Sequence, residues 1–463
     1  MRMSMLLLTA ACALLSTRAV LAEGIRAGVA TCEITPPTEC AMWGYSARQG
    51  VSQSVHDALM AKVLALAGEK GSLAIVALDL GRPFDKDLLE MIEKRAAAVG
   101  VERVMIAASH THQGPDLESR DWPTAQSPWQ DEAAAKVADA VVAAARGMRP
   151  AVLGFGTGEV DLAHNRILVQ PDGTVAMFWR NAERVPTAPV DKTVRVLRVD
   201  SAEGEHLALL VNYACHAVVL GPDNLMLSAD YPGAMRRVVE AGWGGECFFL
   251  QGACGDINPY VDKTPLAEGG LEEMETMGRE LGQEVLRVAK GIEVAAPAAP
   301  TVTSSRRVFE FKPRWNFSDP KTVEMMMERY RAYIEQLGEE KVRGYVARMS
   351  SGATVPGTAA VVGGAYAFCG FPGEFFVDFQ MDLARRSPLP AMMFLGYADG
   401  YAGYFPTIAA AARGGYGASY STSVELGAGE RMVDVAAISI LEAMGRLRPV
   451  PDAEAPDYPP KED

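Results

Sequence analysis

Two histidines, His110 and His112, stand one residue apart directly after a short apolar run. In an extended chain, residues i and i+2 point to the same side, so both imidazoles can face one site. Imidazole is a common metal ligand and a common general acid–base group. The chain has only six histidines, so a close pair is unusual. A solvated polar loop is the alternative, and this three-residue motif alone leaves both interpretations open.

Further groups that can bind a metal or transfer a proton follow other apolar runs. Strands are predicted at 104–108, 207–213, 247–251, 365–371 and 392–395. Open α/β sheets place their chemistry where strands end. Taken singly, each group also has an ordinary structural role, such as a core histidine, a helix-start carboxylate, an ion pair or a packed ring. The residues at these strand ends are His110 with His112, then His216, Asp256, Glu374, and Tyr401 with Tyr404.

Helical segments alternate with the predicted strands. Amphipathic patterns predict helices at 86–98, 127–146, 272–289 and 432–447, and one long helical stretch at 322–348. Such alternation predicts the α/β class, as a layered domain with a mixed central sheet flanked by helices and the site at strand ends. The Ala/Pro segment 295–300 does not divide it, because candidate site residues continue beyond it.

One buried acid and the cysteines add structural expectations. The predicted strand 73–80 carries Asp79, which in an apolar run needs a partner; it either orients a ligand or caps the next loop. No C-x-x-C pair exists, so a thiolate zinc knuckle is not expected. One disulfide, Cys32 with Cys40, is proposed. Buried thiols are expected at Cys215, Cys247 and Cys369.

Composition and the termini restrict the class of protein. The formal net charge is −14 and the basic residues are not clustered, which argues against nucleic-acid binding and against attraction to an anionic membrane.

Residues 1–22 have a positive start, an apolar run and a small-residue end, which predicts a signal peptide and a mature chain from Glu23. A lipid anchor at Cys12 would leave a very short apolar run. No later segment has the ~20 apolar residues of a membrane helix, so an exported protein, periplasmic or extracellular, is expected. Residues 448–463 predict a disordered acidic, proline-rich tail.

Taken together and in order, several blocks resemble the neutral, non-lysosomal ceramidase family. The resemblance covers residues 25 to about 447, and spaced blocks in the right order are more specific than any single one. It implies one catalytic domain over 23–447. The blocks are Trp43-Gly44-Tyr45, Ser109 to Pro115, Asn165-Arg166, Asn212 to His216, Gly255 to Pro259, Pro372-Gly373-Glu374, and Tyr404 to Tyr416.

The resemblance also implies a role for each matched residue. The family binds one zinc ion, and its ligands correspond to His110, His216, Glu374 and Tyr404, with Tyr401 as the fallback tyrosine. The groups that act without binding zinc correspond to His112, Arg166 and Tyr416. Zinc-activated water would attack the amide carbonyl. His112 would transfer the proton, and the other two would stabilise the oxyanion.

Two departures from the family pattern are visible. The family has Gly-Asp-x-Ser-Pro, and its serine has been considered as a nucleophile; here Asn258 takes that place. An amide is not a nucleophile, so zinc-bound water is favoured. Family enzymes also commonly carry an immunoglobulin-like domain after the catalytic one, whereas this chain is expected to end with the catalytic unit.

The sequence therefore predicts an exported Zn²⁺-dependent amidohydrolase of the ceramidase type, with a role in sphingolipid metabolism. Its expected substrate is a small-molecule or lipid amide, and peripheral contact with a membrane stays open. Two alternatives remain: the same fold and zinc acting on a different amide or ester, or a non-catalytic descendant that binds a lipid or sugar.

Overall fold

An eight-stranded mixed sheet lies at the centre of the structure, a computed structural model that describes residues 24–117, 127–331, 334, 338–419 and 421–447. The predicted signal peptide and the predicted tail lie outside these residues. The strand order is β13-β11-β10-β6-β1-β3-β4-β5, with β4/β5 and β11/β13 parallel and the other pairs antiparallel. The strands are β1 (Arg26–Glu33), β3 (Met60–Ala67), β4 (Ser72–Leu78), β5 (Arg103–Ala108), β6 (Arg149–Glu159), β10 (Thr193–Ser201), β11 (His206–Tyr213) and β13 (Glu246–Gln251).

A second, four-stranded sheet packs on one face of the large sheet. Alternate residues of a strand point to opposite faces, so each sheet supplies side chains to two cores. Leu64 and Ile75 of the large sheet share one core with Phe368 and Met393 of the small one. The strands, in the order β15-β16-β17-β19, are β15 (Val302–Phe311), β16 (Ala353–Val362), β17 (Tyr366–Gly370) and β19 (Ala391–Leu395).

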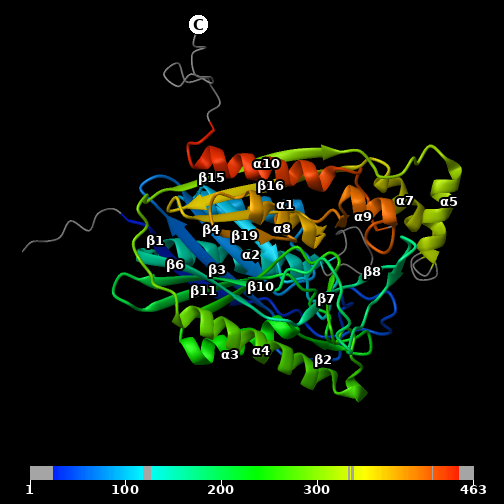
Figure 1. Cartoon of the computed structure of the whole chain (residues 1–463), viewed down its shortest axis with the longest axis horizontal. Coiled ribbons are helices and arrows are strands. Elements are labelled where there is room, and N and C mark those ends of the chain that lie inside the picture. The colour runs from blue at the N-terminus through cyan, green and yellow to red at the C-terminus, as the bar shows by residue number, and fades with distance from the viewer. Residues whose placement is uncertain (1–23, 118–126, 332–333, 335–337, 420, 448–463) are drawn as a thin grey trace, which may run out of the picture.

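Helices cover the two outer faces, which gives four layers (Figure 1). The large sheet is covered by α1 (Lys86–Ala97), α2 (Ser127–Arg146), α3 (Tyr231–Trp243) and α4 (Gly270–Lys290). The small sheet is covered by α8 (Val377–Arg386) and α10 (Ala428–Ala443). The predicted mixed sheet flanked by helices is therefore confirmed, while the second sheet was not predicted.

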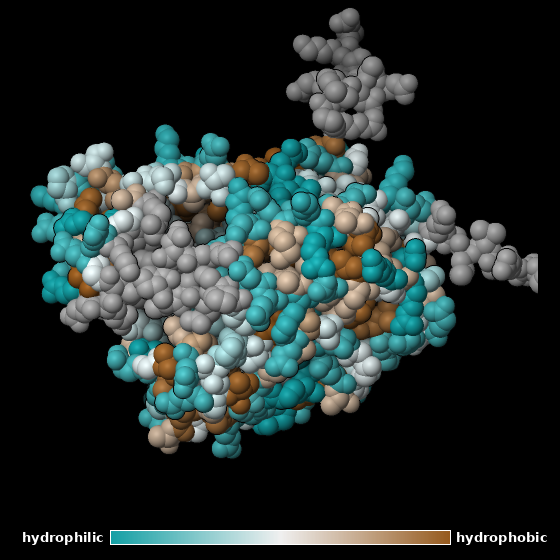
Figure 2. Space-filling view, turned by 180° about the vertical axis from the view of Figure 1, so that it is seen from behind, coloured by the Kyte–Doolittle hydropathy of each residue, from teal (hydrophilic) through white to brown (hydrophobic). Residues whose placement is uncertain are grey.

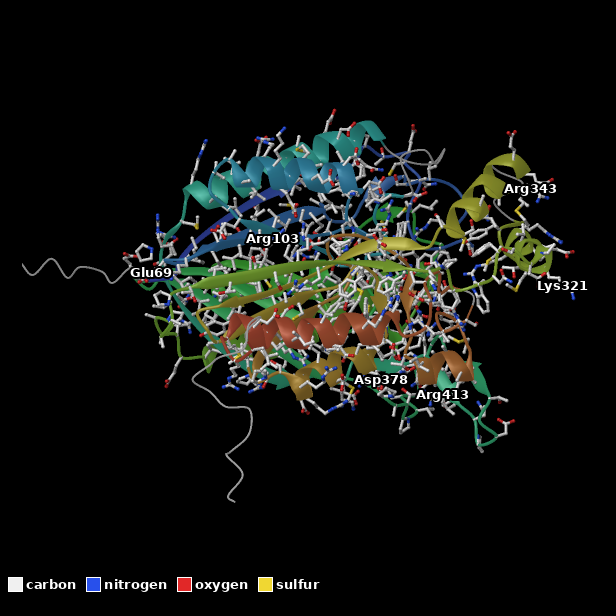
Figure 3. All side chains as sticks on the ribbon, turned by 90° about the horizontal axis from the view of Figure 1, so that it is seen from above. Glu69, Arg103, Lys321, Arg343, Asp378 and Arg413 are labelled. Atoms are coloured by element: carbon white, nitrogen blue, oxygen red, sulfur yellow. The ribbon has the colours of Figure 1, made fainter. Side chains whose placement is uncertain are left out.

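Three parallel strand pairs bring the chemically active loops to one end of the sandwich. The pairs β4/β5, β11/β13 and β17/β19 run in register, so their carboxyl ends open into neighbouring loops. Figure 3 shows helices α5 and α7, which carry Lys321 and Arg343, projecting at the end opposite Glu69. The shorter elements are β2 (Ser54–Val55), β7 (Ala163–Asn165), β8 (Ile167–Val169), β9 (Val175–Met177), β12 (Met226–Leu227), β14 (Ile257–Pro259), η1 (Leu266–Glu268), α5 (Pro320–Arg329), α7 (Glu339–Met349), β18 (Glu374–Phe375), β20 (Tyr404–Phe405) and α9 (Ile408–Arg413).

The prediction of one long helix over 322–348 is wrong. Helix α5 ends at Arg329 and α7 begins at Glu339. Gly338, directly before α7, has a φ of +85°, a left-handed conformation that a continuous helix does not contain. The apolar pattern continues across the break because both helices pack on the same small core, which contains Met326 and Val342.

The proposed Cys32–Cys40 disulfide is also wrong, because both are free thiols. Cys32 lies in β1, in the ladder with β3, while the Cys40 Sγ lies 3.2 Å from Ser52 Oγ. The two thiols thus have separate surroundings that the short sequence spacing does not reveal. The buried free thiols expected at 215, 247 and 369 are confirmed.

Asp79 has the partner that a buried acid needs, and this partner lies on a distant helix. Its carboxylate forms a bidentate ion pair with Arg236, at 2.5 and 2.6 Å, and Oδ2 also accepts from Met60 N at 2.8 Å. The partner lies on α3, so this pair ties the end of β4 to a helix far along the chain.

The described part of the chain contains no helix that is long and apolar enough to cross a bilayer. On the face seen in Figure 2, apolar residues lie in small groups separated by polar ones.

Candidate metal centre

Three histidines gather at the strand ends. Ring nitrogens of His110, His112 and His216 all lie within 4.8 Å of one another and could hold a metal ion. His110 and His112 follow β5, and His216 follows β11. The Nε2 atoms of His110 and His112 are 3.3 Å apart, which confirms that the two imidazoles face one site. His110 and His216 are each only 1% exposed.

Backbone carbonyls fix the tautomers of His110 and His216. The Nδ1 of His110 lies 2.6 Å from Gly81 O, and the Nδ1 of His216 lies 3.0 Å from Ile257 O. A carbonyl only accepts, so both Nδ1 atoms carry the proton. Burial, helped by the charge of Arg166, lowers the pKa of His216 to about 4. The Nε2 of His216 therefore presents a lone pair to the site near neutral pH, as in metal-binding histidines.

The carboxylate of Glu374 lies beside the Nε2 atoms of His110 and His216. Its Oε2 is 3.2 Å from His216 Nε2 and 3.5 Å from His110 Nε2. Burial opposes ionisation of Glu374, but its interactions with the two histidines outweigh burial and hold its pKa well below the usual range. This donor set of two imidazoles and one carboxylate suits zinc.

Two tyrosines lie beside Glu374 in different ways. The Tyr401 hydroxyl donates to Glu374 Oε1 at 2.5 Å. Tyr404 is the β-ladder partner of Glu374, and its hydroxyl accepts from Arg166 Nη2 at 3.0 Å. Burial raises the pKa of both phenols well above the usual value, and proximity to Glu374 adds to this effect. Either phenol is placed to serve as the fourth protein donor.

His112 differs from the other two histidines in its surroundings. Its Nδ1 is buried and has no hydrogen-bond partner among the described residues. Burial, followed by the nearby His110 and His216, lowers its pKa well below the usual value. The Gly44 backbone passes directly over its ring: a Cβ there would lie 2.4 Å from the imidazole. The Trp43-Gly44-Tyr45 block therefore packs tightly on a neutral imidazole.

Arg166 is buried beside aromatic rings and contacts the site through Tyr404. Its Nη2 donates to Gly255 O at 2.6 Å and to the Tyr404 hydroxyl, and its Nη1 donates to Asn258 Oδ1 at 3.1 Å. The guanidinium lies 5.3 Å from the centre of the Tyr416 ring. Tyr416 is 39% exposed, so it is the most accessible of the predicted catalytic groups.

A cavity of about 460 Å³ opens onto this constellation. Its walls include His110, His112 and Glu374, together with Tyr401, Tyr404 and Tyr416, whereas His216 is not one of the lining residues. Five of the seven predicted ligand and catalytic positions therefore line the cavity; His216 and Arg166 do not line it, and Arg166 contacts the lining residues Tyr404 and Tyr416.

Sequence reasoning missed Tyr397. Its ring stacks on His110 with centroids 4.0 Å apart, and its hydroxyl lies 3.5 Å from Glu374 Oε2 and 3.1 Å from Cys254 Sγ. Its φ of +52° is unusual for a side-chain-bearing residue. The available signal was its position two residues after β19 in a glycine-bearing loop.

Comparisons with known proteins identify relatives of this chain. It is 26% identical, over 314 residues, to the neutral ceramidase of Pseudomonas aeruginosa, a match that covers 64% of this chain and 44% of that protein. The chain therefore matches less than half the length of that curated relative. The fold is similar to the crystal structure of neutral ceramidase from Pseudomonas aeruginosa, with a TM-score of 0.69, 18% identity, and 94% and 76% of the two chains covered. A ceramidase complexed with C2 gives a TM-score of 0.68, 18% identity, and 94% and 77% coverage.

The model of the family described as neutral/alkaline non-lysosomal ceramidase, N-terminal, matches residues 25–296. This range contains the three histidines and Arg166, whereas Glu374 and the tyrosines lie beyond it and are joined to the histidines by the fold. Because the match spans more than half of its length, the chain belongs to the neutral/alkaline non-lysosomal ceramidase family.

Proposed function

We propose that this protein is a zinc-dependent amidohydrolase that cleaves the N-acyl amide bond of ceramide or of a related lipid amide. The observation that carries the proposal is the convergence of two buried imidazole Nε2 atoms and a carboxylate beside a cavity. Membership of a ceramidase family supports amide hydrolysis as the reaction.

The ligands would be His110, His216, Glu374 and Tyr404, with Tyr401 the alternative to Tyr404. A zinc ion held there would supply a Lewis acid that activates water and polarises the substrate carbonyl. The Nδ1 contacts of the two histidines support this assignment, since such contacts orient metal ligands and fix their tautomer.

The remaining groups have separable tasks. The neutral His112 imidazole, 3.3 Å from His110 Nε2, would take a proton from the attacking water and return it to the leaving amine. Arg166 and the Tyr416 phenol, which lines the cavity beside the guanidinium, would stabilise the negative charge that develops on the carbonyl oxygen. Gly44 keeps the His112 ring in place by contact.

A second candidate is hydrolysis of a different amide or ester by the same site. The observation that favours it is that the cavity lining includes Asp116, Arg329, Ser421 and Ser423 beside apolar residues such as Met42 and Met349. Arg329 Nη2 donates to Ser421 Oγ at 2.6 Å. The polar part of this lining suits a short or polar acyl group better than a long alkyl chain, because burying charged groups against hydrocarbon is unfavourable.

The deciding experiment measures zinc content and hydrolysis together. The purified chain should bind about one zinc, lose activity to a chelator, and regain it with added zinc. A series of N-acyl sphingosines from acetyl to palmitoyl, beside short N-acyl amides and esters, separates the two candidates.

The ligand assignment is tested by three variants, His110→Ala, His216→Ala and Glu374→Ala, each of which should lose zinc. Folded variants that all retain it would refute the ligand assignment, and a zinc-free, inactive wild type would favour a lipid- or sugar-binding protein.

Export and domain organisation complete the proposal. Residues 1–22 would be a signal peptide, 23–447 the catalytic domain and 448–463 a tail, in a periplasmic or extracellular protein. Mass measurement of the protein recovered from the periplasm or medium tests this, since cleavage after Ala22 predicts a mature start at Glu23.

A further inference from the structure

One side-chain amide contacts both histidine-bearing segments. Gln251, the last residue of β13, is fully buried. Its Nε2 donates to Ser109 O at 2.9 Å and to Cys215 O at 2.8 Å. Those two carbonyls belong to the residues directly before His110 and His216. Its Oε1 accepts from Cys215 N at 3.3 Å, so every hydrogen-bonding atom of the amide is used on these segments.

The two peptide groups that Gln251 contacts are also held from their other side. The N–H of His110 donates to Leu80 O at 2.9 Å, and the N–H of His216 donates to Ile257 O at 3.0 Å. Each peptide plane before a site histidine is therefore fixed at both its N–H and its C=O. A fixed peptide plane fixes the direction in which the next side chain leaves the backbone.

His110 needs such restraint because its backbone is strained. Its φ is +61°, in the left-handed region that residues with a side chain seldom adopt. Strained residues at functional sites persist only where surrounding contacts over-determine them. The carbonyl of Ser109, one bond from this strained torsion, is held by Gln251.

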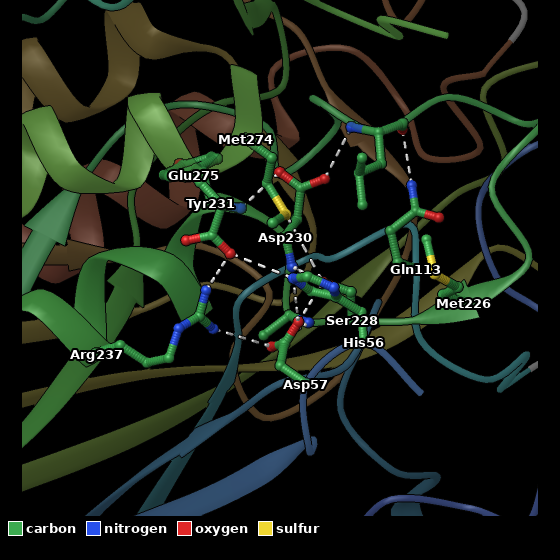
Figure 4. Close-up of polar contacts among 12 residues, drawn as sticks. His56, Asp57, Gln113, Met226, Ser228, Asp230, Tyr231, Arg237, Met274 and Glu275 are labelled. Carbon is green, nitrogen blue, oxygen red and sulfur yellow. Dashed lines mark hydrogen bonds and ion pairs between the residues drawn. The ribbon is translucent and has the colours of Figure 1, made fainter. Parts of the chain in front are cut away.

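The start of α3 supports the His216 segment from a second direction. The Tyr231 hydroxyl donates to Cys215 O at 2.6 Å, so this carbonyl accepts from two buried donors. Asp230 accepts from the N–H groups of Val219 and Leu220 at 3.3 and 3.1 Å. Figure 4 shows Asp230 and Tyr231 within the polar network that leads outward to other charged side chains.

We propose that Gln251 is a positioning residue of the metal centre, whose carboxamide sets the separation and direction of the His110 and His216 imidazoles. The proposal rests on the proposed metal site but not on the identity of the substrate. Partners that orient metal ligands typically contribute 10–100-fold to metal affinity. Losing this amide should therefore weaken zinc binding rather than merely lower the stability of the fold.

Gln251→Met tests the role, because it keeps the length of the side chain and removes its three hydrogen bonds. Asn212→Leu is the matched control. Asn212 is also fully buried, and its Nδ2 likewise donates to two carbonyls, Leu250 O at 2.9 Å and Phe394 O at 2.8 Å. It bridges strands and contacts neither histidine-bearing segment through its side chain.

Zinc affinity is measured by competition with a chromophoric chelator, beside the visible spectrum of the Co²⁺-loaded protein and the melting temperature of the metal-free protein. We expect both variants to melt at lower temperature, but only Gln251→Met to bind zinc about 10–100-fold more weakly with a changed Co²⁺ spectrum. If Gln251→Met does not fold, Gln251→Asn, which keeps the amide but cannot span both carbonyls, should show the same loss in smaller degree.

Wild-type zinc affinity and spectrum in the folded Gln251 variants would overturn the positioning role. An equal loss of affinity in Asn212→Leu would do so as well, because the effect would then follow stability alone. A wild-type protein that binds neither metal would overturn the proposed function first and the positioning role with it, so the two failures are distinguishable.

Discussion

Replacing Asn258 by alanine tests what this residue does in the position where the family motif has serine. Asn258 is fully buried; its Oδ1 accepts from Arg166 Nη1 at 3.1 Å and its Nδ2 donates to Asp262 Oδ2 at 2.9 Å. The amide thus links a buried cation to a buried acid. We infer that its role is to hold Arg166, and that water is the attacking group.

The size of the effect follows from the contacts that remain. Without the amide, Arg166 keeps Gly255 O and the Tyr404 hydroxyl, and Asp262 keeps its 2.5 Å contact with Lys263 Nζ. The variant loses two hydrogen bonds to charged partners, each worth about 1.5–3 kcal/mol, so the free energy of unfolding should fall by about 3–6 kcal/mol. Turnover should fall less than ~10²-fold, since a lost oxyanion donor itself costs ~10²–10³-fold.

The assay combines kcat on zinc-loaded, folded protein with rapid quench and intact-mass measurement during turnover. Asn258→Ser, which returns the family's residue, is the matched variant and should also give no acyl adduct. Asn258→Ala that is folded and zinc-loaded but more than 10³-fold slower would refute the reasoning, as would a kinetically competent acyl adduct anywhere on the wild-type chain.

Three further predictions concern neighbouring groups. His112→Ala should keep zinc but lose about 10²–10⁴-fold in kcat, and near wild-type kcat in the zinc-loaded variant would exclude it as the proton-transfer group. Tyr404→Phe should weaken zinc binding more than Tyr401→Phe does, measured by chelator competition; the opposite order would make Tyr401 the ligand. Burial raises the pKa of Asp256 from 3.8 to about 7, so the folded protein binds a proton that the unfolded chain has lost, and this contribution to stability disappears as pH rises through 7. As pH rises from 4 to 8, the free energy of unfolding measured with urea should therefore fall for the wild type relative to Asp256→Asn, by up to about 4 kcal/mol. A difference between the two proteins that does not change with pH would contradict this.

The parts of the site that the sequence could predict are those encoded locally. An apolar run followed by a polar loop located the ends of β5 and β11, and hence His110 and His216, because strand ends gather at one edge of a sheet. Glu374 was harder, since Pro-Gly-Glu also occurs before helices. Here Glu374 lies in the two-residue strand β18, and α8 begins three residues later at Val377.

What could not be predicted depends on contacts between distant segments. Asp79 finds Arg236 on α3, and Gln251 reaches Ser109 and Cys215, across separations that no local pattern encodes. The second sheet escaped prediction for the same reason. An apolar strand such as β17 is equally compatible with extending one large sheet or with facing it, and only packing decides between them.

The surroundings of the cavity support water as the nucleophile independently of Asn258. Among the described residues that line it, the serines are Ser421, which accepts from Arg329, and Ser423, which donates to Ala402 O at 2.8 Å. Within the described part of the chain, neither hydroxyl forms a hydrogen bond with a site histidine that could act as its base. The Cys254 Sγ lies 3.1 Å from the Tyr397 hydroxyl, but burial raises the pKa of this thiol well above the usual value and Cys254 does not line the cavity. A side-chain nucleophile requires an adjacent base or a lowered pKa. Since neither condition is met here, the neutral imidazole of His112 is left with water as the group it can activate.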